Sequence, residues 1–472
     1  MRAQGVAAGD RVGLYLGNRP ELVVAYFGAL RAGAVVVPIN PALTAAEVAP
    51  LADHVGLTLV VVDRSTSLVA ADAMPAVARF VVGAGTGPGT FQSLLVGGGG
   101  PLGQPPGGDA LALVIYTSGQ SGDPKGAMLT HRALVASVEQ VASAPVAVVE
   151  PGDVVLMLLP LTHVYSLAGT LGALTREAAT GVMVEAADAS AALQAVRQHH
   201  VTNVPGAPSL WTAWASEPDA VEVLGQLRIA FSGSAELPVE VQQRIHAITG
   251  WYIHEGYGLT EAAPGVSSTV VSGRAKPGSV GRPFAGVEVK LVDDDGEVID
   301  PADGDPGEIW IRGENVFSGY WPDGRGGPDS DGWFATGDVA FADDDGDLHI
   351  VDRRGDVIIV SGFNVYPREV ESAMRQCAGV RDVAVVGVPD PRTGEAVKAF
   401  VVADDGLSEA DLHAHAASRL ARFKQPRTFE LLESLPHSSS GQVARGRVDR
   451  GGVEPGGVDA AQDEAAQDEG AP

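Results

Sequence analysis

The chain has 472 residues, a formal net charge of −27 and a single cysteine, Cys377. This length predicts two or more domains, and the negative charge argues against nucleic acid and against electrostatic docking on anionic membranes. One cysteine excludes an internal disulfide and any multi-cysteine metal site. The N-terminus lacks the apolar core of a signal peptide, and the longest apolar stretch is broken by Arg31 and ends at Pro38, so a cytoplasmic, soluble protein without a transmembrane segment is predicted.

In the first third of the chain, strand-like apolar runs alternate with helical ones. The expected elements are a strand at 9–16, a helix at 21–32 ending at Gly33, and strands at 35–37 and 59–62. This alternation is typical of a parallel α/β architecture. Residues 83–108 are rich in glycine and proline and predict a loop or linker.

A segment rich in glycine and hydroxyl groups occupies residues 116–126. It follows the apolar run 110–115, which predicts a buried strand, and precedes a helix expected to begin near Thr130. Its sequence is Tyr-Thr-Ser-Gly-Gln-Ser-Gly-Asp-Pro-Lys-Gly. Glycines let backbone N–H groups turn towards a phosphate, Ser and Thr add donors, and Lys adds a mobile positive charge. The spacing is not that of the NTPase P-loop, and taken alone the segment could also be a flexible surface loop.

After Glu261 the pattern changes to short strands and turns. Two Asp-Asp-Asp-Gly runs, at 293–296 and 343–346, lie between apolar runs and predict tight hairpins. Neither run has the ligand spacing of a calcium loop, so we expect solvated hairpin tips rather than metal sites.

A compact α/β pattern returns from residue 356 to about residue 449, with strands expected at 383–388 and 398–402. The tail repeats Ala-Ala-Gln-Asp-Glu at 460–464 and 465–469 and is expected to be disordered.

Four further motifs follow the glycine-rich segment in a fixed order. They are Gly-Tyr-Gly-Leu-Thr-Glu at 256–261, Asp-Gly-Trp-Phe-Ala-Thr-Gly-Asp at 331–338, Asp-Arg-Arg-Gly-Asp at 352–356 and Ser-Gly-Phe-Asn-Val-Tyr-Pro-Arg-Glu-Val-Glu at 361–371. Together the five segments resemble the ordered signatures of the adenylate-forming enzymes, which include acyl-CoA synthetases, adenylation domains and luciferases. The chain is most similar to bacterial long-chain fatty-acid–CoA ligases, and the resemblance extends from about Val12 to Arg447.

The resemblance implies an α/β multidomain fold. The expected parts are an AMP-binding N-terminal domain at 1–352, built from α/β subdomains and a small β-rich subdomain, a hinge at 353–356, a small mobile C-terminal α+β lid domain at 357–450, and an acidic tail at 451–472. The beginning looks abrupt beside the family, so we expect a misplaced start or a shortened first subdomain.

The resemblance also implies a reaction. ATP transfers AMP to a fatty-acid carboxylate with release of pyrophosphate, and the thiol of coenzyme A then displaces AMP. The enzyme must neutralise the triphosphate, hold the carboxylate in line with the α-phosphorus and stabilise the charge that develops. The expected ligands are therefore ATP, Mg²⁺, coenzyme A and a fatty acid, all small molecules, and the oligomeric state is not predicted.

By resemblance, the glycine-rich segment holds the phosphates through Thr117, Ser118, Gly119, Gln120, Ser121, Gly122 and Lys125. Glu261 would hold Mg²⁺ and Thr260 would contact the α-phosphate. One carboxylate together with phosphate oxygens is an ordinary Mg²⁺ site.

The same resemblance assigns the nucleoside. Tyr257, followed by Gly258, offers a flat face for adenine, and the adenine edge is lined by Ser234, Ala235 and Glu236. Asp338 would accept both ribose hydroxyls and Arg353 would donate to the same sugar. Outside these motifs, a tyrosine beside glycines would indicate core packing, and an Asp after Thr-Gly would indicate a turn.

Two positions are assigned to the acyl and thiol substrates. His163, in the segment Leu-Pro-Leu-Thr-His-Val-Tyr at 159–165, corresponds to the family position beside the acyl carboxylate. Gly362 would line the pantetheine tunnel, where a side chain would block the thiol.

Three positions depart from the family pattern. Gln120 replaces a usual threonine, and Gly355 replaces a usual hinge lysine or aspartate. The segment 435–445 aligns with the loop that carries the catalytic lysine, and that lysine is Gln442 here. Losing a preorganised charged donor costs about 3–4 kcal/mol, or about 10²–10³ in rate, so we predict weak adenylation with a surviving thioester half-reaction.

Three functions remain in competition. The first is an ATP-dependent fatty acyl-CoA ligase. The second is a degenerate relative that binds ATP or acyl-AMP without efficient turnover, favoured by Gln442 and Gln120. The third, an amino-acid-activating domain, ranks last because the segment 159–167 offers no carboxylate for a substrate ammonium.

Overall fold

The computed structural model describes residues 1–83, 85–96, 104–117, 125–184, 188–217, 220–360, 363–390, 392–436 and 448. The chain divides into two compact units, unit 1 (Met1–Ile350) and unit 2 (Val351–Pro472).

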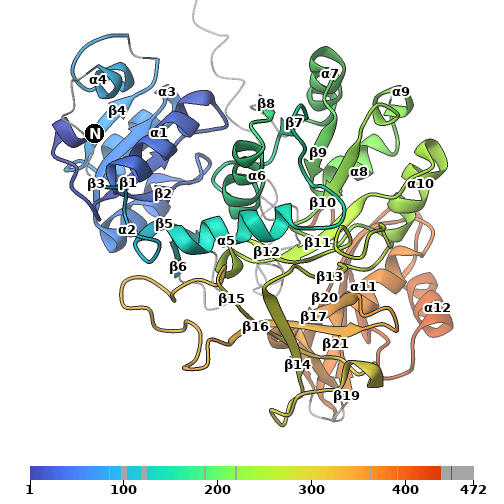
Figure 1. Cartoon of the computed structure of the whole chain (residues 1–472). Coiled ribbons are helices and arrows are strands. Elements are labelled where there is room, and N and C mark those ends of the chain that lie inside the picture. The colour runs from blue at the N-terminus through green and yellow to red at the C-terminus, as the bar shows by residue number, and fades with distance from the viewer. Residues whose placement is uncertain are drawn as a thin grey trace, which may run out of the picture. The chain divides into compact units, whose positions relative to one another are not determined.

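A six-stranded sheet with the order β4-β3-β1-β2-β5-β6 forms the first part of unit 1 (Figure 1). Its strands are β1 (Arg11–Tyr15), β2 (Val35–Pro38), β3 (Leu57–Val62), β4 (Ala78–Val81), β5 (Leu111–Thr117) and β6 (Lys125–Thr130). The connecting helices are η1 (Arg2–Gln4), α1 (Pro20–Ala32), α2 (Ala45–Val55), α3 (Arg64–Ala73) and α4 (Phe91–Leu95). All pairs in this sheet are parallel except β5 with β6.

The predicted strand and helix alternation is confirmed in this sheet. Helix α1 has Pro20 in its first turn and ends at Gly33, whose φ of 80° is the left-handed conformation that glycine adopts without strain. The loop predicted at 83–108 is wrong in part, because Thr90 caps the short helix α4 and Phe91 is buried. Helix α5 (His131–Ala142) begins as predicted after Thr130, but strand β6 precedes it.

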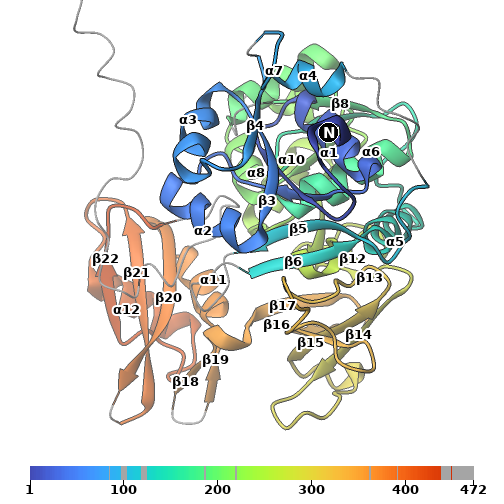
Figure 2. The same cartoon turned by 90° about the vertical axis from the view of Figure 1, so that its left-hand side faces the viewer.

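A seven-stranded sheet with the order β13-β12-β11-β10-β9-β7-β8 forms the second part of unit 1 (Figure 1), and its strands β8, β12 and β13 are also labelled in Figure 2. Its strands are β7 (Val154–Met157), β8 (Thr180–Met183), β9 (Asn203–Gly206), β10 (Ile229–Ser232), β11 (His254–Gly258), β12 (Gly265–Ser268) and β13 (Arg282–Pro283). The helical segments are α5, η2 (Tyr165–Thr170), α6 (Leu171–Arg176), α7 (Ala189–His199), α8 (Pro208–Trp214), α9 (Ala220–Leu224), α10 (Val239–Thr249) and η3 (Thr260–Ala262). Strands β7 to β11 pair in parallel, so their carboxyl ends meet at one edge.

A four-stranded sheet, β14-β15-β16-β17, completes the β-rich part. It contains β14 (Val287–Val292), β15 (Gly307–Gly313), β16 (Phe334–Ala342) and β17 (Leu348–Arg353), with η4 (Pro301–Asp303) between β14 and β15. Both predicted hairpin turns are confirmed: the amide of Asp293 donates to Glu297 O at 3.0 Å, and that of Asp343 to Asp347 O at 3.0 Å. The second tip is not merely solvated, since Asp343 is half-buried and carries an ion-pair cluster.

Unit 2 is an α+β body with a five-stranded sheet in which β19-β18-β21-β20 are neighbours and β22 pairs with β21. Its elements are η5 (Arg354–Asp356), β18 (Ile358–Val360), β19 (Phe363–Val365), α11 (Pro367–Arg375), β20 (Val380–Asp390), β21 (Gly394–Ala403), α12 (Glu409–Arg419) and β22 (Thr428–Leu431). The strands predicted at 383–388 and 398–402 lie inside β20 and β21. The predicted disordered tail lies outside the described residues.

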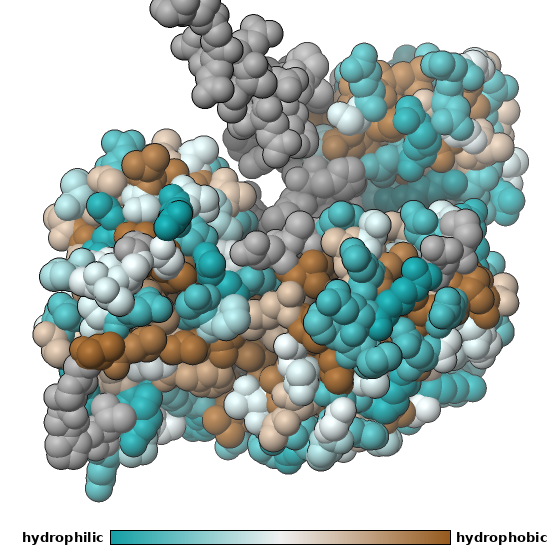
Figure 3. Space-filling model, turned by 90° about the horizontal axis from the view of Figure 1, so that it is seen from above, coloured by the Kyte–Doolittle hydropathy of each residue, from teal (hydrophilic) through white to brown (hydrophobic). Residues whose placement is uncertain are grey.

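Among the described helices, none combines the length and apolar character that a membrane span requires. Hydrophobic and hydrophilic residues are interspersed on the face seen in Figure 3. Val24, Phe27 and Leu68 are exposed apolar side chains. Single exposed apolar residues of this kind are ordinary on folded proteins.

Candidate active site

Six of the predicted site residues of unit 1 follow the carboxyl ends of parallel strands in the seven-stranded sheet. His163 follows β7, Ser234 to Glu236 follow β10, and Thr260 and Glu261 follow β11. Ligands of open α/β sheets bind at such edges, because the loops that leave the strands converge there. The sheet therefore gathers residues that are about 100 positions apart in the sequence.

Glu261 is 8 % exposed and lies in η3 directly after β11. The phenol of Tyr320 donates to Glu261 Oε1 at 2.6 Å. The Nζ of Lys125, the first residue of β6, lies 5.4 Å from the centre of the Tyr320 ring. The predicted metal ligand and the predicted phosphate-binding lysine thus share one tyrosine.

The phosphate segment leaves and re-enters the six-stranded sheet on neighbouring antiparallel strands. Thr117 ends β5 and pairs directly with Lys125 at the start of β6. The next pair is Tyr116 with Gly126, and a Cβ on Gly126 would lie 3.2 Å from Tyr116 Cζ. Glycine at 126 therefore permits the Tyr116 ring to lie across β6.

Tyr257 and Asp338 form a second pair. Tyr257 Oη donates to Asp338 Oδ2 at 2.6 Å, and Asp338 is 6 % exposed. Asp338 lies on β16 of the four-stranded sheet, whereas Tyr257 lies on β11 of the seven-stranded sheet. The hydrogen bond therefore joins the residues predicted for ribose and adenine across two sheets.

His163 has a defined tautomer. Its Nδ1 accepts a hydrogen bond from the amide of Tyr165 at 3.3 Å, so in the neutral ring the proton resides on Nε2. Burial lowers the pKa of His163 and favours this neutral form. The Nε2–H group can donate to a substrate carboxylate without carrying a full charge.

The segment predicted to line the adenine edge approaches Tyr165. A Cβ on Gly233 would lie 3.1 Å from Tyr165 Cε1, so the missing side chain admits the ring. Burial raises the pKa of Tyr165 and keeps its phenol protonated. Ser234 has a φ of 71°, a left-handed conformation that is uncommon outside glycine and that clusters at functional sites.

Gly258 is required by close backbone packing. A Cβ at this position would lie 2.2 Å from Pro264 O, nearer than any real contact. Because Gly258 separates Tyr257 from the Thr260–Glu261 turn, its lack of a side chain sets how tightly the chain folds between them.

Glu255 lies near the start of β11 and is contacted by the backbone of Leu237. Leu237 N donates to its Oε2 at 3.2 Å, and Gln242 Nε2 donates to its Oε1 at 3.0 Å. Burial raises the pKa of Glu255 to about 7, an effect that these donors only partly offset and that nearby Glu236 strengthens. The carboxyl group therefore titrates near neutral pH.

The other predicted site residues divide into two groups. Arg353 lies in unit 2 at the end of β17, where its amide donates to Asp352 Oδ1 at 2.8 Å. Outside the described residues lie Ser118, Gly119, Gln120, Ser121, Gly122, Gly362 and Gln442.

Sequence reasoning missed Tyr320 and Glu255. Tyr320 stands in a Ser-Gly-Tyr-Trp-Pro stretch with no spacing rule, and only tertiary structure brings it to Glu261. Glu255 directly precedes the motif at 256–261, and nothing in the sequence distinguishes it from an ordinary solvent-exposed glutamate.

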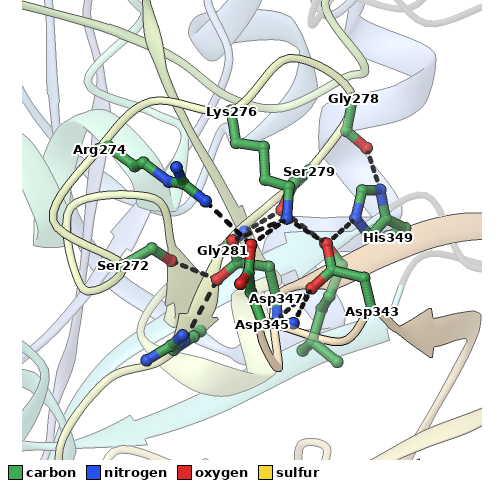
Figure 4. Close-up of polar contacts among 12 residues, drawn as sticks. Ser272, Arg274, Lys276, Gly278, Ser279, Gly281, Asp343, Asp345, Asp347 and His349 are labelled. Atoms are coloured by element: carbon green, nitrogen blue, oxygen red, sulfur yellow. Dashed lines mark hydrogen bonds and ion pairs between the residues drawn. The ribbon is translucent and has the colours of Figure 1, made fainter.

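Three carboxylates also converge at the β16–β17 turn, those of Asp343, Asp345 and Asp347 (Figure 4). Lys276 Nζ lies among them, at 2.5 Å from Asp343, 2.9 Å from Asp345 and 3.6 Å from Asp347. His349 adds a ring contact to Asp343 Oδ2 at 2.7 Å. The lysine ammonium supplies the positive charge that a metal ion would otherwise bring.

The residues in unit 1 fit a metal-bound nucleotide. Glu261 offers a hard carboxylate oxygen of the type that Mg²⁺ prefers, and Lys125 offers a point charge for phosphate. Asp338 is a buried acceptor suited to sugar hydroxyls, and Tyr257 adds an aromatic face.

Known protein families and structures are similar to this chain over most of its length. Residues 1–321 match the AMP-binding enzyme family, and residues 369–442 match the AMP-binding enzyme C-terminal domain. A long-chain-fatty-acid–CoA ligase of Bacillus subtilis (strain 168) is 33 % identical over 94 % of this chain and 86 % of its own length. A feruloyl-CoA synthase of Amycolatopsis sp is 38 % identical over 94 % of this chain and 89 % of its own. The crystal structure of ATP-bound MatB from Rhodopseudomonas palustris matches with a TM-score of 0.87 and 31 % identity, covering 95 % of this chain and 90 % of that one. The chain belongs to the AMP-binding enzyme family, the adenylate-forming enzymes that include the acyl-CoA ligases.

Proposed function

We propose that the protein is an ATP-dependent fatty acyl-CoA ligase with weakened adenylation. The overall change joins a carboxylic acid to the thiol of coenzyme A, with ATP converted to AMP and pyrophosphate. The observation that carries the proposal is the grouping of Glu261, Lys125 and Tyr320 near the strand ends that also hold Thr260, together with the Tyr257–Asp338 pair.

In this proposal, Lys125 and Thr117 bind the outer phosphates together with residues 118–122. Mg²⁺, when bound, would screen the triphosphate charge and help pyrophosphate to leave. Glu261 is the residue that would hold it, and Thr260 contacts the α-phosphate. Tyr257, Gly258 and residues 234–236 bind adenine, while Asp338 binds the ribose hydroxyls.

His163 orients the acid. The neutral ring favoured by burial donates through Nε2–H to one carboxylate oxygen and leaves the other to attack the α-phosphorus. A neutral donor suits this role, because a full positive charge would stabilise the ground-state carboxylate and lower its nucleophilicity.

The acid is proposed to be apolar. The segment 165–174 carries no charged side chain, and Leu167 and Leu171 within it are buried. Relatives named for long-chain fatty acids and for ferulate are both consistent with an apolar acyl group. The assay with different acids determines the length of the acyl chain and whether an aromatic acid is accepted.

Unit 2 is proposed to act as a lid that turns about a hinge at 353–356. Arg353 would donate to the ribose in one conformation, and Gly362 would line the thiol channel in the other. The domains proposed are therefore 1–352, 357–450 and an acidic tail at 451–472.

A degenerate relative that binds acyl-AMP without efficient turnover is the second candidate. It is favoured by Gln442, which keeps an N–H donor but lacks the charge of the family lysine.

The test compares two half-reactions in the wild type and in Gln442→Lys. One assay follows pyrophosphate release from ATP with a panel of fatty acids and ferulate, and the other follows thioester formation from synthetic acyl-AMP and coenzyme A. We expect slow pyrophosphate release by the wild type, a gain of about 10²–10³ with Gln442→Lys, and thioester formation by both. If neither protein showed activity in either assay, the result would contradict the ligase hypothesis and favour the relative that binds without efficient turnover.

A further inference from the structure

Residues 317–321 connect the predicted metal ligand to the strand that follows the phosphate segment. We call these residues the brace. The amide of Phe317 donates to Glu261 O at 2.8 Å, which fixes the first end of the brace to the η3 turn. The amide of Trp321 donates to Gly126 O at 2.8 Å, which fixes the other end to β6. The brace therefore couples two elements that are more than 100 residues apart in the chain.

Tyr320 is the brace residue whose side chain reaches both groups. Its hydroxyl donates to Glu261 Oε1 at 2.6 Å, and its ring lies 5.4 Å from Lys125 Nζ. The Phe317 ring meets the Tyr320 ring edge to face, with centroids 5.0 Å apart, and restricts its rotation. One rigid aromatic side chain thus contacts a carboxylate and an ammonium at once.

The chemistry of Tyr320 and Glu261 determines which of the two donates the hydrogen bond. An ionised carboxylate only accepts hydrogen bonds, so Tyr320 must donate. The ordinary pKa of a tyrosine phenol is about 10, so the donor is present at physiological pH. With Oε1 held by the phenol, the rotation of the carboxylate is fixed and Oε2 is the oxygen presented to a cation.

We propose that Tyr320 is a positioning residue that orients the Glu261 carboxylate for a divalent cation and steers the Lys125 ammonium towards the same triphosphate. This inference rests on the proposed function, because it takes Glu261 as the metal ligand. Hydrogen-bonding partners of metal ligands set ligand orientation, and their loss costs about 10–100-fold in metal affinity or activity.

The test separates the two contacts of Tyr320. Tyr320→Phe removes the hydroxyl and keeps the ring, whereas Tyr320→Leu removes both. Tyr15→Phe is the matched control, because Tyr15 on β1 donates through Oη to Leu43 O at 2.6 Å, in the connection between β2 and α2, and within the part of the chain that the structure describes it forms no hydrogen bond or ring contact with Glu261 or Lys125. Mn²⁺ bound by each protein in the presence of ATP is titrated by electron paramagnetic resonance, a measurement that needs no turnover.

For Tyr320→Phe we expect the Mn²⁺ concentration at half-saturation to rise by about 10–100-fold. The Mg²⁺ concentration at half-maximal pyrophosphate release should rise in parallel, with a smaller change in the rate at saturating Mg²⁺. Tyr320→Leu should in addition raise the KM for ATP, because Lys125 loses its ring contact. Tyr15→Phe should change stability only.

Two outcomes would overturn the inference. If Tyr320→Phe unfolds at a lower temperature but binds Mn²⁺ like the wild type, the tyrosine is merely structural. If Glu261→Gln binds Mn²⁺ like the wild type, Glu261 is no metal ligand, and the inference that Tyr320 orients it for a cation is wrong. By contrast, weaker Mn²⁺ binding by Tyr320→Phe, without pyrophosphate release by the wild type or Gln442→Lys, would support the positioning role and reject the ligase.

Discussion

The phenol of Tyr257 donates to the carboxylate of Asp338 at 2.6 Å and joins the seven-stranded sheet to the four-stranded sheet. The bond restricts the orientation of a buried acceptor, since Asp338 is 6 % exposed. Both residues were predicted from separate motifs to contact one nucleoside, and the structure places them in direct contact.

The first prediction concerns this pair. Tyr257→Phe removes a hydrogen bond to a charged group, which is worth about 1.5 kcal/mol or more, so ATP affinity should fall about tenfold. Isothermal titration with ATP gives the affinity without turnover. Asp338→Asn and the double variant complete a cycle, in which the double variant should lose less than the sum of the singles. Tighter ATP binding by Tyr257→Phe would mean that the tyrosine competes with ribose.

The second prediction concerns Gly258. In Gly258→Ala the new Cβ would lie 2.2 Å from Pro264 O, and backbone must shift to relieve the clash. We expect a large loss of stability and of soluble yield, measured by urea unfolding. Gly28→Ala is the control: Gly28 lies inside α1 with nothing within 4 Å of a built Cβ, so this change should stabilise by up to about 1 kcal/mol. Equal stability of the two variants would contradict the close packing.

The third prediction concerns the Lys276 cluster. Burial alone would raise the pKa of Asp343, but hydrogen bonds from Lys276 and His349 lower it well below its usual range. A carboxyl whose pKa is depressed in the native state adds stability above its unfolded pKa and loses it as the pH falls. Lys276→Met should therefore destabilise most near pH 7, and the difference from the wild type should shrink below about pH 4.

Urea midpoints measured across this pH range provide the check. Arg274→Met is the matched control, because Arg274 is 68 % exposed and pairs with Asp345 alone among the described residues, so it should change the midpoint little. A Lys276→Met effect that does not vary with pH would indicate lost packing of the lysine stem rather than lost charge.

The fourth prediction concerns Glu255, whose pKa is raised from 4.5 to about 7 by burial. The native state then holds this proton more tightly than the unfolded chain does, so rising pH destabilises the native state between these two values. The contribution is as much as about 3 kcal/mol. Glu255→Gln keeps a neutral acceptor and should remove this decline.

The measurement is the difference between the unfolding curves of Glu255→Gln and the wild type from about pH 4 to pH 8. A difference is needed because burial lowers the pKa of the adjacent His254 to about 4, and that group has the opposite pH dependence. Parallel curves would show that the Glu255 carboxyl does not carry its proton to neutral pH.

Much of the fold could be predicted where local chemistry determines it. Gly33 ends α1, Thr130 caps α5, and the Asp-Gly turns close where their sequences indicate. Strand β6 was not predicted, because its sequence Lys-Gly-Ala-Met-Leu-Thr has little strand propensity. Its pairing with β5 determines its conformation.

The candidate site divides in the same way. Glu261 and Asp338 stand in motifs whose order predicts their roles, whereas Tyr320 has no such pattern. The role proposed for Tyr320 depends on where the chain returns after β15, which is a tertiary property. The Lys276 cluster shows the same limit, since the lysine comes from a loop about 70 residues before the carboxylates it neutralises.

The brace has one more consequence, for self-association. Strand β6 is the last strand on its side of the six-stranded sheet, so one row of its backbone groups would be open to another chain. Residues 318–321 fill that row: the amide of Ser318 donates to Met128 O, and that of Met128 donates to Gly319 O. A version of the chain cut before residue 317 would expose this edge and aggregate through it, whereas a fragment extending to residue 321, where the family match ends, would keep it covered.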